Sequence, residues 1–210
     1  MPSNRYQRVE DFIRTIIIPF YYIQRDIYVP VEERRWENDA EHSWSVAMLA
    51  ATLAHHIDPS LDIGKVCQFA LVHDVVEIYA KDTSVFANKA ELASKADREA
   101  AALKQLAKDF VHFPWLTDTI EAYECKNTNE AKYVYAIDKY IAITFDYMEK
   151  GRLYRERNFS LAEHNKILEA HRQKAHSHAG VAKYYEEVRT MLNAHPEFFA
   201  KAYNKQHEKY

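Results

Sequence analysis

The chain has 210 residues, and its 28 basic and 31 acidic side chains leave a formal net charge of −3 at pH 7. This length suits one domain with a sizeable core, and the near balance of charge argues against a surface that coats a nucleic-acid polymer. The longest apolar run, residues 15–23, is too short to cross a bilayer, so we expect no membrane partner.

Almost every segment has the apolar spacing of a helix, and only 3 glycines and 6 prolines are present to form turns. The first helix is predicted over residues 9–23, kinked or ended by Pro19, and residues 26–40 are predicted to be irregular. Further helices are predicted over residues 40–57, 63–79, 87–111, 115–125, 130–150, 160–175 and 180–193, with a short helical tail after Pro196. No segment has a convincing strand pattern, so we expect residues 1–210 to form a single all-α domain, a multi-helix bundle.

Some local signals refine this prediction. Thr128 or Asn129 could cap the helix over 130–150, and Gly151 is expected to end it. The helix over 87–111 is polar and alanine-rich, so it should be more exposed than buried. Cys67 and Cys125 lie in apolar surroundings and are expected to be reduced core thiols. Because no signal peptide is visible either, we expect a cytoplasmic protein.

The dipeptide His73-Asp74 lies inside an apolar stretch over residues 69–77. Two polar side chains in a buried helix are costly to desolvate unless a partner compensates them. Because imidazole and carboxylate both bind transition metals, a divalent ion is a suitable partner. The sequence therefore predicts a metal site here, provided that further ligands come from elsewhere.

Two such ligands stand on other predicted helices. His42 precedes one apolar helical run, and Asp138 lies inside another. Taken singly, His42 could be a polar residue at a helix start, and Asp138 could form a buried salt bridge. Three separated helices that each place a ligand on an apolar face favour a shared metal site made of His42, His73, Asp74 and Asp138.

Glu77 lies four residues after His73, on the same helical face and one turn along. This position is too far along the helix for an obvious metal ligand, but it suits a group that holds a metal-activated water. The alternative, a solvated charge at a helix end, is nearly as well supported by the sequence alone.

The chain resembles the HD-domain phosphohydrolases, and in particular their single-domain 5′-deoxynucleotidase branch. The resemblance lies in three motifs: Glu41-His42-Ser43, then His73-Asp74 followed by Glu77 and Asp82, and finally Ile137-Asp138-Lys139. The resemblance implies an HD-type helical bundle with a metal-site core over about residues 20–150, on which helices over 160–210 pack. It also implies that the four ligands bind one divalent ion (Co, Mn, Mg, Zn or Fe), that Glu77 and Asp82 are catalytic, and that the protein is a homodimer. The implied substrates are small phosphoesters, namely deoxyribonucleoside 5′-monophosphates.

The sequence also departs from that branch. The family often has Gly-Asp where this chain has Lys81-Asp82, and its substrate-binding arginine is often followed by tryptophan, whereas Arg25 is followed by Asp26. Arg34 and Arg35, next to Trp36, are alternative phosphate donors, although a solvated charge run is the simpler interpretation. Arg25, Arg34, Arg35 and Lys81 are therefore the candidate substrate-binding residues.

These features favour a metal-dependent phosphomonoesterase of (deoxy)ribonucleoside 5′-monophosphates. A two-metal enzyme is disfavoured because only His112 lies between Asp74 and Asp138, and a hydrolase of guanosine tetraphosphate is disfavoured because Ile78, not an acid, follows Glu77. Three alternatives remain: a hydrolase of another small phosphoester, a regulatory module that binds a nucleotide or metal at a degenerate site, and a helical scaffold. His171, His176 and His178 are expected to be solvated, and Tyr133, Tyr140 and Tyr147 to form a packing face.

Overall fold

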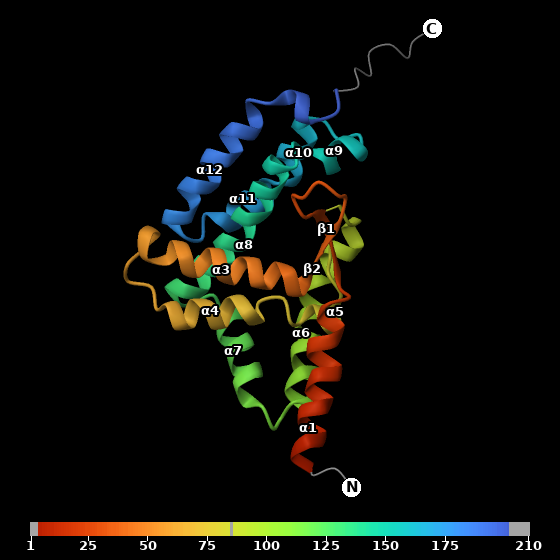
Figure 1. The fold of residues 1–210 in the computed structure, drawn as a ribbon, viewed down its shortest axis with the longest axis vertical. Helices are drawn as coiled ribbons and strands as arrows, with labels where there is room; N and C mark the ends of the chain where they lie inside the picture. Colours follow the sequence, from red (N-terminus) through yellow and green to blue (C-terminus); the bar gives the residue numbers. More distant parts are fainter. Residues whose placement is uncertain (1–3, 85, 202–210) are drawn as a thin grey trace.

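The computed structural model describes residues 4–84 and 86–201, and helices make up most of this part of the chain (Figure 1). The predicted all-α fold class is confirmed. The longer helices are α1 (Asn4–Phe12), α3 (Asp39–Ile57), α4 (Ile63–Val72), α6 (Lys89–Asp109), α7 (Pro114–Glu124), α8 (Asn129–Met148) and α12 (Ala179–Asn193). The shorter ones are α2 (Ile18–Phe20), α5 (Glu77–Ala80), α9 (Arg152–Glu156), α10 (Leu161–Ile167), α11 (Glu169–Ala175) and the 3₁₀ turn Pro196–Phe198.

Helix α8 lies at the centre of the fold and packs against α3, α4, α7, α11 and α12 (Figure 1). Its start is set by Thr128, whose hydroxyl accepts a hydrogen bond from the Ala131 amide, so one of the two predicted caps is confirmed. Shortly after its end, Gly151 adopts φ +62°, a left-handed conformation that glycine tolerates well. Tyr133, Tyr140 and Tyr147 on this helix pack into the core, as predicted.

The first helical segment starts earlier than predicted, at Asn4, and ends at Phe20. Between α1 and α2 it widens into a π-helical turn over Ile13–Ile17, just before Pro19. A proline ring clashes with the carbonyl four residues earlier, and the wider turn accommodates this ring within a continuing helix. The irregularity predicted at Pro19 is therefore observed, as a π-helical turn before the proline and a helix end at Phe20 just after it.

Residues 26–40 are not wholly irregular, contrary to the prediction. The strands β1 (Gln24–Tyr28) and β2 (Trp36–Asn38) form an antiparallel pair in which Gln24 faces Asn38 and Tyr28 faces Trp36. The Tyr28 and Trp36 rings lie 4.1 Å apart and help to hold the pair. Such short strands carry too few residues for an alternating pattern, which is why the sequence did not reveal them.

The helix predicted over 63–79 is also interrupted. Helix α4 ends at Val72, residues 73–76 form a turn, and α5 begins at Glu77. His73 and Asp74 therefore lie at a helix end rather than in the middle of a helix. The buried side chains form three clusters: one joins α3, α4, α7, α8 and α12, a second joins α2, α5, α6 and α7, and a third joins α8 to the C-terminal helices.

Other predictions about burial are partly corrected. Helix α6 is largely exposed as predicted, although Ala102 and Leu106 are buried. Cys67 and Cys125 are free thiols, but Cys125 is exposed and Cys67 is only half-buried, so neither is a core thiol. Within residues 4–84 and 86–201, none of the helices is long and apolar enough to span a bilayer.

Candidate metal centre and adjoining cavity

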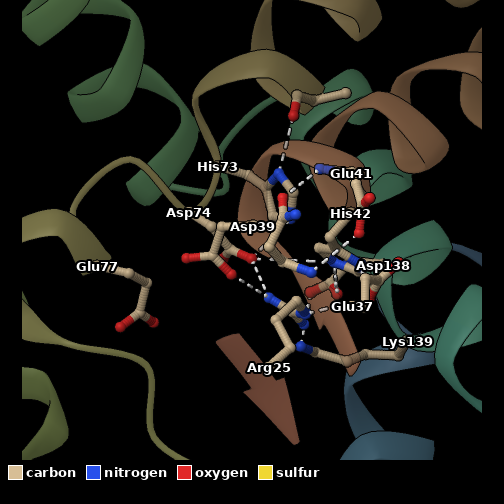
Figure 2. A network of polar contacts seen from close by, with 12 residues as sticks. Arg25, Glu37, Asp39, Glu41, His42, His73, Asp74, Glu77, Asp138 and Lys139 are labelled. Atoms are coloured by element: carbon tan, nitrogen blue, oxygen red, sulfur yellow. Dashed lines mark hydrogen bonds and ion pairs between the residues drawn. The ribbon is translucent and has the colours of Figure 1, made fainter. Parts of the chain in front are cut away.

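The two histidines of the candidate site present the same ring nitrogen to a common space (Figure 2). His73 Nδ1 lies 2.8 Å from the Ala70 carbonyl oxygen, which can only accept, so Nδ1–H donates. His42 Nδ1 lies 3.1 Å from the Glu37 carboxylate and is oriented in the same way. These contacts leave the lone pair of each Nε2 free to bind a cation.

Asp138 completes a compact cluster with these histidines. Its Oδ1 lies 3.1 Å from His42 Nε2, and the ligand atoms of His42, His73 and Asp138 lie within 4.8 Å of one another, all buried. Asp74 adjoins this cluster, because its Oδ2 lies 3.2 Å from His73 Nε2 and 3.8 Å from His42 Nε2. The structure thus brings the four predicted ligands together, with Asp74 shared between the cluster and Arg25.

The donor set fits a divalent metal ion. His73 Nε2 is buried and makes no hydrogen bond to the described part of the chain. Two imidazole lone pairs facing two carboxylates would repel one another without a positive charge between them. Nitrogen and oxygen ligands in this number suit zinc, iron, cobalt or manganese, and the donor set alone does not select among them.

Arg25, on β1, forms the floor of the site (Figure 2). Its guanidinium lies 2.6 Å from Asp74, 3.2 Å from Asp39 and 3.4 Å from Glu37. Burial disfavours the charge of Arg25, but Asp74 and the other carboxylates more than offset this and raise its pKa. Burial raises the pKa of Asp39 to about 8, helped by Asp74 and opposed by Arg25. Arg25 therefore orients acids of the site as well as facing the cavity.

Glu77 lies apart from the cluster, at the start of α5 (Figure 2). It is 3% exposed, and its Oε1 pairs with Lys95 of α6 at 3.2 Å while Oε2 has no hydrogen-bond partner in the described residues. Burial raises the pKa of Glu77 to about 7, with Lys95 opposing the rise. A buried carboxylate with a free oxygen is suited to hold a water or to accept a proton.

Asp82 follows in an irregular segment that is bound to Arg98 of α6. Arg98 donates hydrogen bonds to the Ala80 and Lys81 carbonyls and, at 2.7 Å, to the Thr83 hydroxyl. These contacts hold the residues on both sides of Asp82, which lines a cavity together with Glu77. Nothing in the sequence distinguished Arg98 from the other charged residues of its helix.

The cavity has a volume of about 250 Å³, adjoins the candidate metal cluster through Asp74 and extends toward the C-terminal helices. Its polar end is lined by Arg25, Asp74, Glu77, Asp82, Lys95, Lys139, His171 and Lys174. Its other end is lined mainly by apolar side chains, among them Phe86, Ile143, Leu153, Tyr154, Ile167 and Leu168. A charged end joined to an apolar end suits a ligand that carries both a charged group and an organic part.

Of the four candidate substrate-binding residues, Arg25 alone lines this cavity. Arg34 pairs with Glu156 and contacts Tyr28, and Arg35 pairs with Glu41 beside a separate open groove. Lys81 is exposed. The structure therefore does not bring Arg34, Arg35 or Lys81 to the cavity.

The sequence did not reveal that Lys95, His171 and Lys174 line the cavity. His171 was expected to be solvated, but burial and the nearby Lys139 lower its pKa to about 3, so this ring is neutral. His178 was also expected to be solvated and is 7% exposed. His176 is exposed as predicted. The apolar spacing of the C-terminal helices gives no sign of which polar residue faces a cavity.

The comparisons with known proteins agree with this geometry. A family profile described as HD domain matches residues 22–179, which is well over half of the chain. A solved structure described as a predicted metal-dependent phosphohydrolase from Magnetospirillum magnetotacticum MS-1 is 25% identical, covers 96% of this chain and 98% of its own, and gives a TM-score of 0.74. No functionally curated protein gives a significant match. The matched residues contain His42, His73, Asp74 and Asp138 in one site, and the chain belongs to the HD-domain family.

Proposed function

We propose that the protein is a metal-dependent phosphomonoesterase that acts on nucleoside 5′-monophosphates. The observation that carries the proposal is the cavity, because Asp74, which adjoins the His–Asp cluster, lines it together with a cationic wall and a set of apolar side chains. The solved neighbour described as a predicted metal-dependent phosphohydrolase supports the general class of reaction. The 5′-deoxynucleotidase branch remains a proposal based on the sequence motifs.

The phosphate is bound by the cations of the polar end. Arg25, Lys95 and Lys139 each have a carboxylate partner within 3.4 Å. Lys174 has none among the described residues, and burial together with Lys139 and Lys95 lowers its pKa. A phosphate dianion at this position would relieve the repulsion between the lysines and gain charge-assisted hydrogen bonds.

His42, His73, Asp74 and Asp138 would hold the ion, which supplies an acidified water and neutralises charge on the phosphoryl oxygens. Glu77 orients the water through its free carboxylate oxygen, and a pKa of about 7 allows it to take up a proton near neutral pH. Asp82, on the cavity wall, assists by positioning the ester or by passing a proton to the leaving 5′-oxygen.

The test is phosphate release from a panel of ribo- and deoxyribonucleoside 5′-monophosphates, with cobalt, manganese or magnesium added. We expect release from monophosphates with about one ion bound per chain, and preferential release from the deoxy series if the branch assignment is right. One bound ion without release from any phosphoester would instead favour the regulatory module. Equal release from ribo- and deoxyribonucleotides would retain the enzyme and reject the branch.

A further inference from the structure

At the far end of the cavity, the carboxylate of Asp146 lies among apolar side chains such as Ile143, Tyr154 and Leu168. Asp146 lines the cavity on the same face of α8 as Lys139, Ala142 and Ile143, at the helical spacing of three, four and seven residues. Seven residues of helix correspond to about 10 Å, so Asp146 lies about two turns beyond the phosphate end. This separation is comparable to that between the phosphate and the outer edge of the base in a nucleotide.

Asp146 has fewer hydrogen bonds than a buried carboxylate needs. It is 7% exposed, and the Tyr154 hydroxyl donates to its Oδ2 at 3.2 Å. His164 Nε2 lies 3.9 Å from the same oxygen, which is too far for a hydrogen bond. No described residue donates to Oδ1. An ionised carboxylate can accept several hydrogen bonds, so acceptor capacity remains on the side of the cavity.

Other polar groups around Asp146 are also unsatisfied. Neither ring nitrogen of His164 has a hydrogen-bond partner in the described part of the chain, although its side chain is 1% exposed, and the Tyr185 hydroxyl is likewise buried and unpaired. Burial raises the pKa of Asp146, as expected when donors are scarce. Such groups are costly in a core, and a bound ligand or an ordered water can supply the partner that the described residues do not.

We infer that Asp146 is a specificity-determining residue that accepts a hydrogen bond from an N–H group on the organic part of the ligand, at the end remote from the phosphate. The inference rests on the proposed function for the position of the phosphate. It narrows the ligand to phosphoesters whose organic part is a planar group with an N–H donor on its outer edge, as in a nucleobase.

The first experiment measures binding without turnover, by calorimetry with two free nucleosides. Thymidine has one N–H on the edge of its base, and 3-methylthymidine has none. We expect the wild-type protein to bind thymidine about tenfold more tightly, because a hydrogen bond to a charged group contributes about that factor. In Asp146→Leu, which keeps the shape and removes the acceptor, the ratio should fall to about one.

Matched variants keep this test decisive. Asp146→Asn retains one acceptor oxygen without the charge, so its ratio of thymidine to 3-methylthymidine affinity should be intermediate. This variant replaces Asp146→Leu if the leucine variant does not fold. Asp118→Asn, on an exposed position of α7, should leave the ratio at the wild-type value. A thermal-denaturation midpoint for each variant separates lost folding from lost recognition.

The outcomes distinguish this inference from the proposed activity. Suppose that the preference for thymidine over 3-methylthymidine depends on Asp146 and that the protein releases no phosphate from any ester. This result would support the inference and reject the activity. Phosphate release combined with an equal thymidine preference in the wild-type protein and Asp146→Leu would support the activity and overturn the inference. Absence of nucleoside binding by the wild-type protein would also overturn it.

Discussion

Glu37 Oε2 lies 3.1 Å from His42 Nδ1, and both side chains are 2% exposed. This contact links β2 to the first turn of α3, where Asn38 caps the helix and Glu41 completes the capping box. The carboxylate fixes the tautomer of His42 and makes its Nε2 a stronger metal ligand. The short hairpin thus positions a candidate metal ligand as well as Arg25.

The Glu37–His42 contact predicts that metal affinity falls when the negative charge of Glu37 is removed. Glu37→Gln should bind the ion about 10-fold to 100-fold more weakly, the range usual for such supporting residues. Metal titration by calorimetry measures this. Glu41→Gln, which changes a more exposed acid of the same turn, is the matched control, and an equal loss in both variants would contradict the role assigned to Glu37.

Lys174 is predicted to bind phosphate, because it is the cation of the cavity wall without a described carboxylate partner. Lys174→Met should raise KM and weaken inhibition by inorganic phosphate about tenfold, with a smaller change in kcat. Lys166→Met on the neighbouring helix α10 is exposed and serves as the control. Unchanged phosphate inhibition in Lys174→Met would show that the phosphate is bound elsewhere.

Lys81 has φ +65° and ψ 141°, a conformation that residues other than glycine adopt at a cost. Lys81→Gly should raise the free energy of unfolding by about 1 kcal/mol, after allowing for the greater freedom of glycine in the unfolded chain. Lys81→Ala retains the Cβ atom and should give no such gain. Urea denaturation compares the two, and equal stabilities would show that the backbone here is not strained.

His178 should make stability depend on pH. Its Nδ1 accepts the Val181 amide at the start of α12, and burial lowers its pKa although Asp58 opposes this. The unfolded chain therefore protonates His178 more readily than the folded protein does. The contribution of neutral His178 to the free energy of unfolding is present above pH 6.5 and is lost as the pH falls from there through the lower pKa of the folded state.

The variant His178→Asn retains a capping side chain that does not titrate. Its loss of stability between pH 7.5 and pH 5 should be smaller than that of the wild-type protein, as measured by urea denaturation at both pH values. His56→Asn, an exposed change in the last turn of α3, controls for the loss of one histidine. Identical pH dependence in His178→Asn and the wild-type protein would rule out this contribution.

The sequence was sufficient to find the candidate metal ligands that the structure brings together, because His42, His73 and Asp138 are polar residues beside or within apolar runs, where burial needs compensation. The family resemblance also made Arg25 a candidate substrate-binding residue, and Arg25 lines the cavity. The sequence could not predict that Lys174, His171 and Asp146 face the same cavity. Their positions depend on how α11 packs against α8, and that contact leaves no periodic signal in either helix.

The fold was predicted to a similar extent. The helices were found where a 3.6-residue apolar pattern persists, as in α3 and α8. The break after Val72 was missed because the residues beyond it, Val75 and Val76, are also buried and continue the apolar pattern. The strands were missed because β2 has only 3 residues, too few for an alternation to be recognised.

The most direct test of the central claim compares metal content and phosphate release in the wild-type protein, Asp138→Ala and Glu77→Gln. The account predicts about one divalent ion per chain and turnover in the wild-type protein. It predicts no stoichiometric ion and no turnover in Asp138→Ala, and a retained ion with turnover reduced at least about 100-fold in Glu77→Gln. Turnover at the wild-type rate by an Asp138→Ala protein that contains no metal would contradict the account.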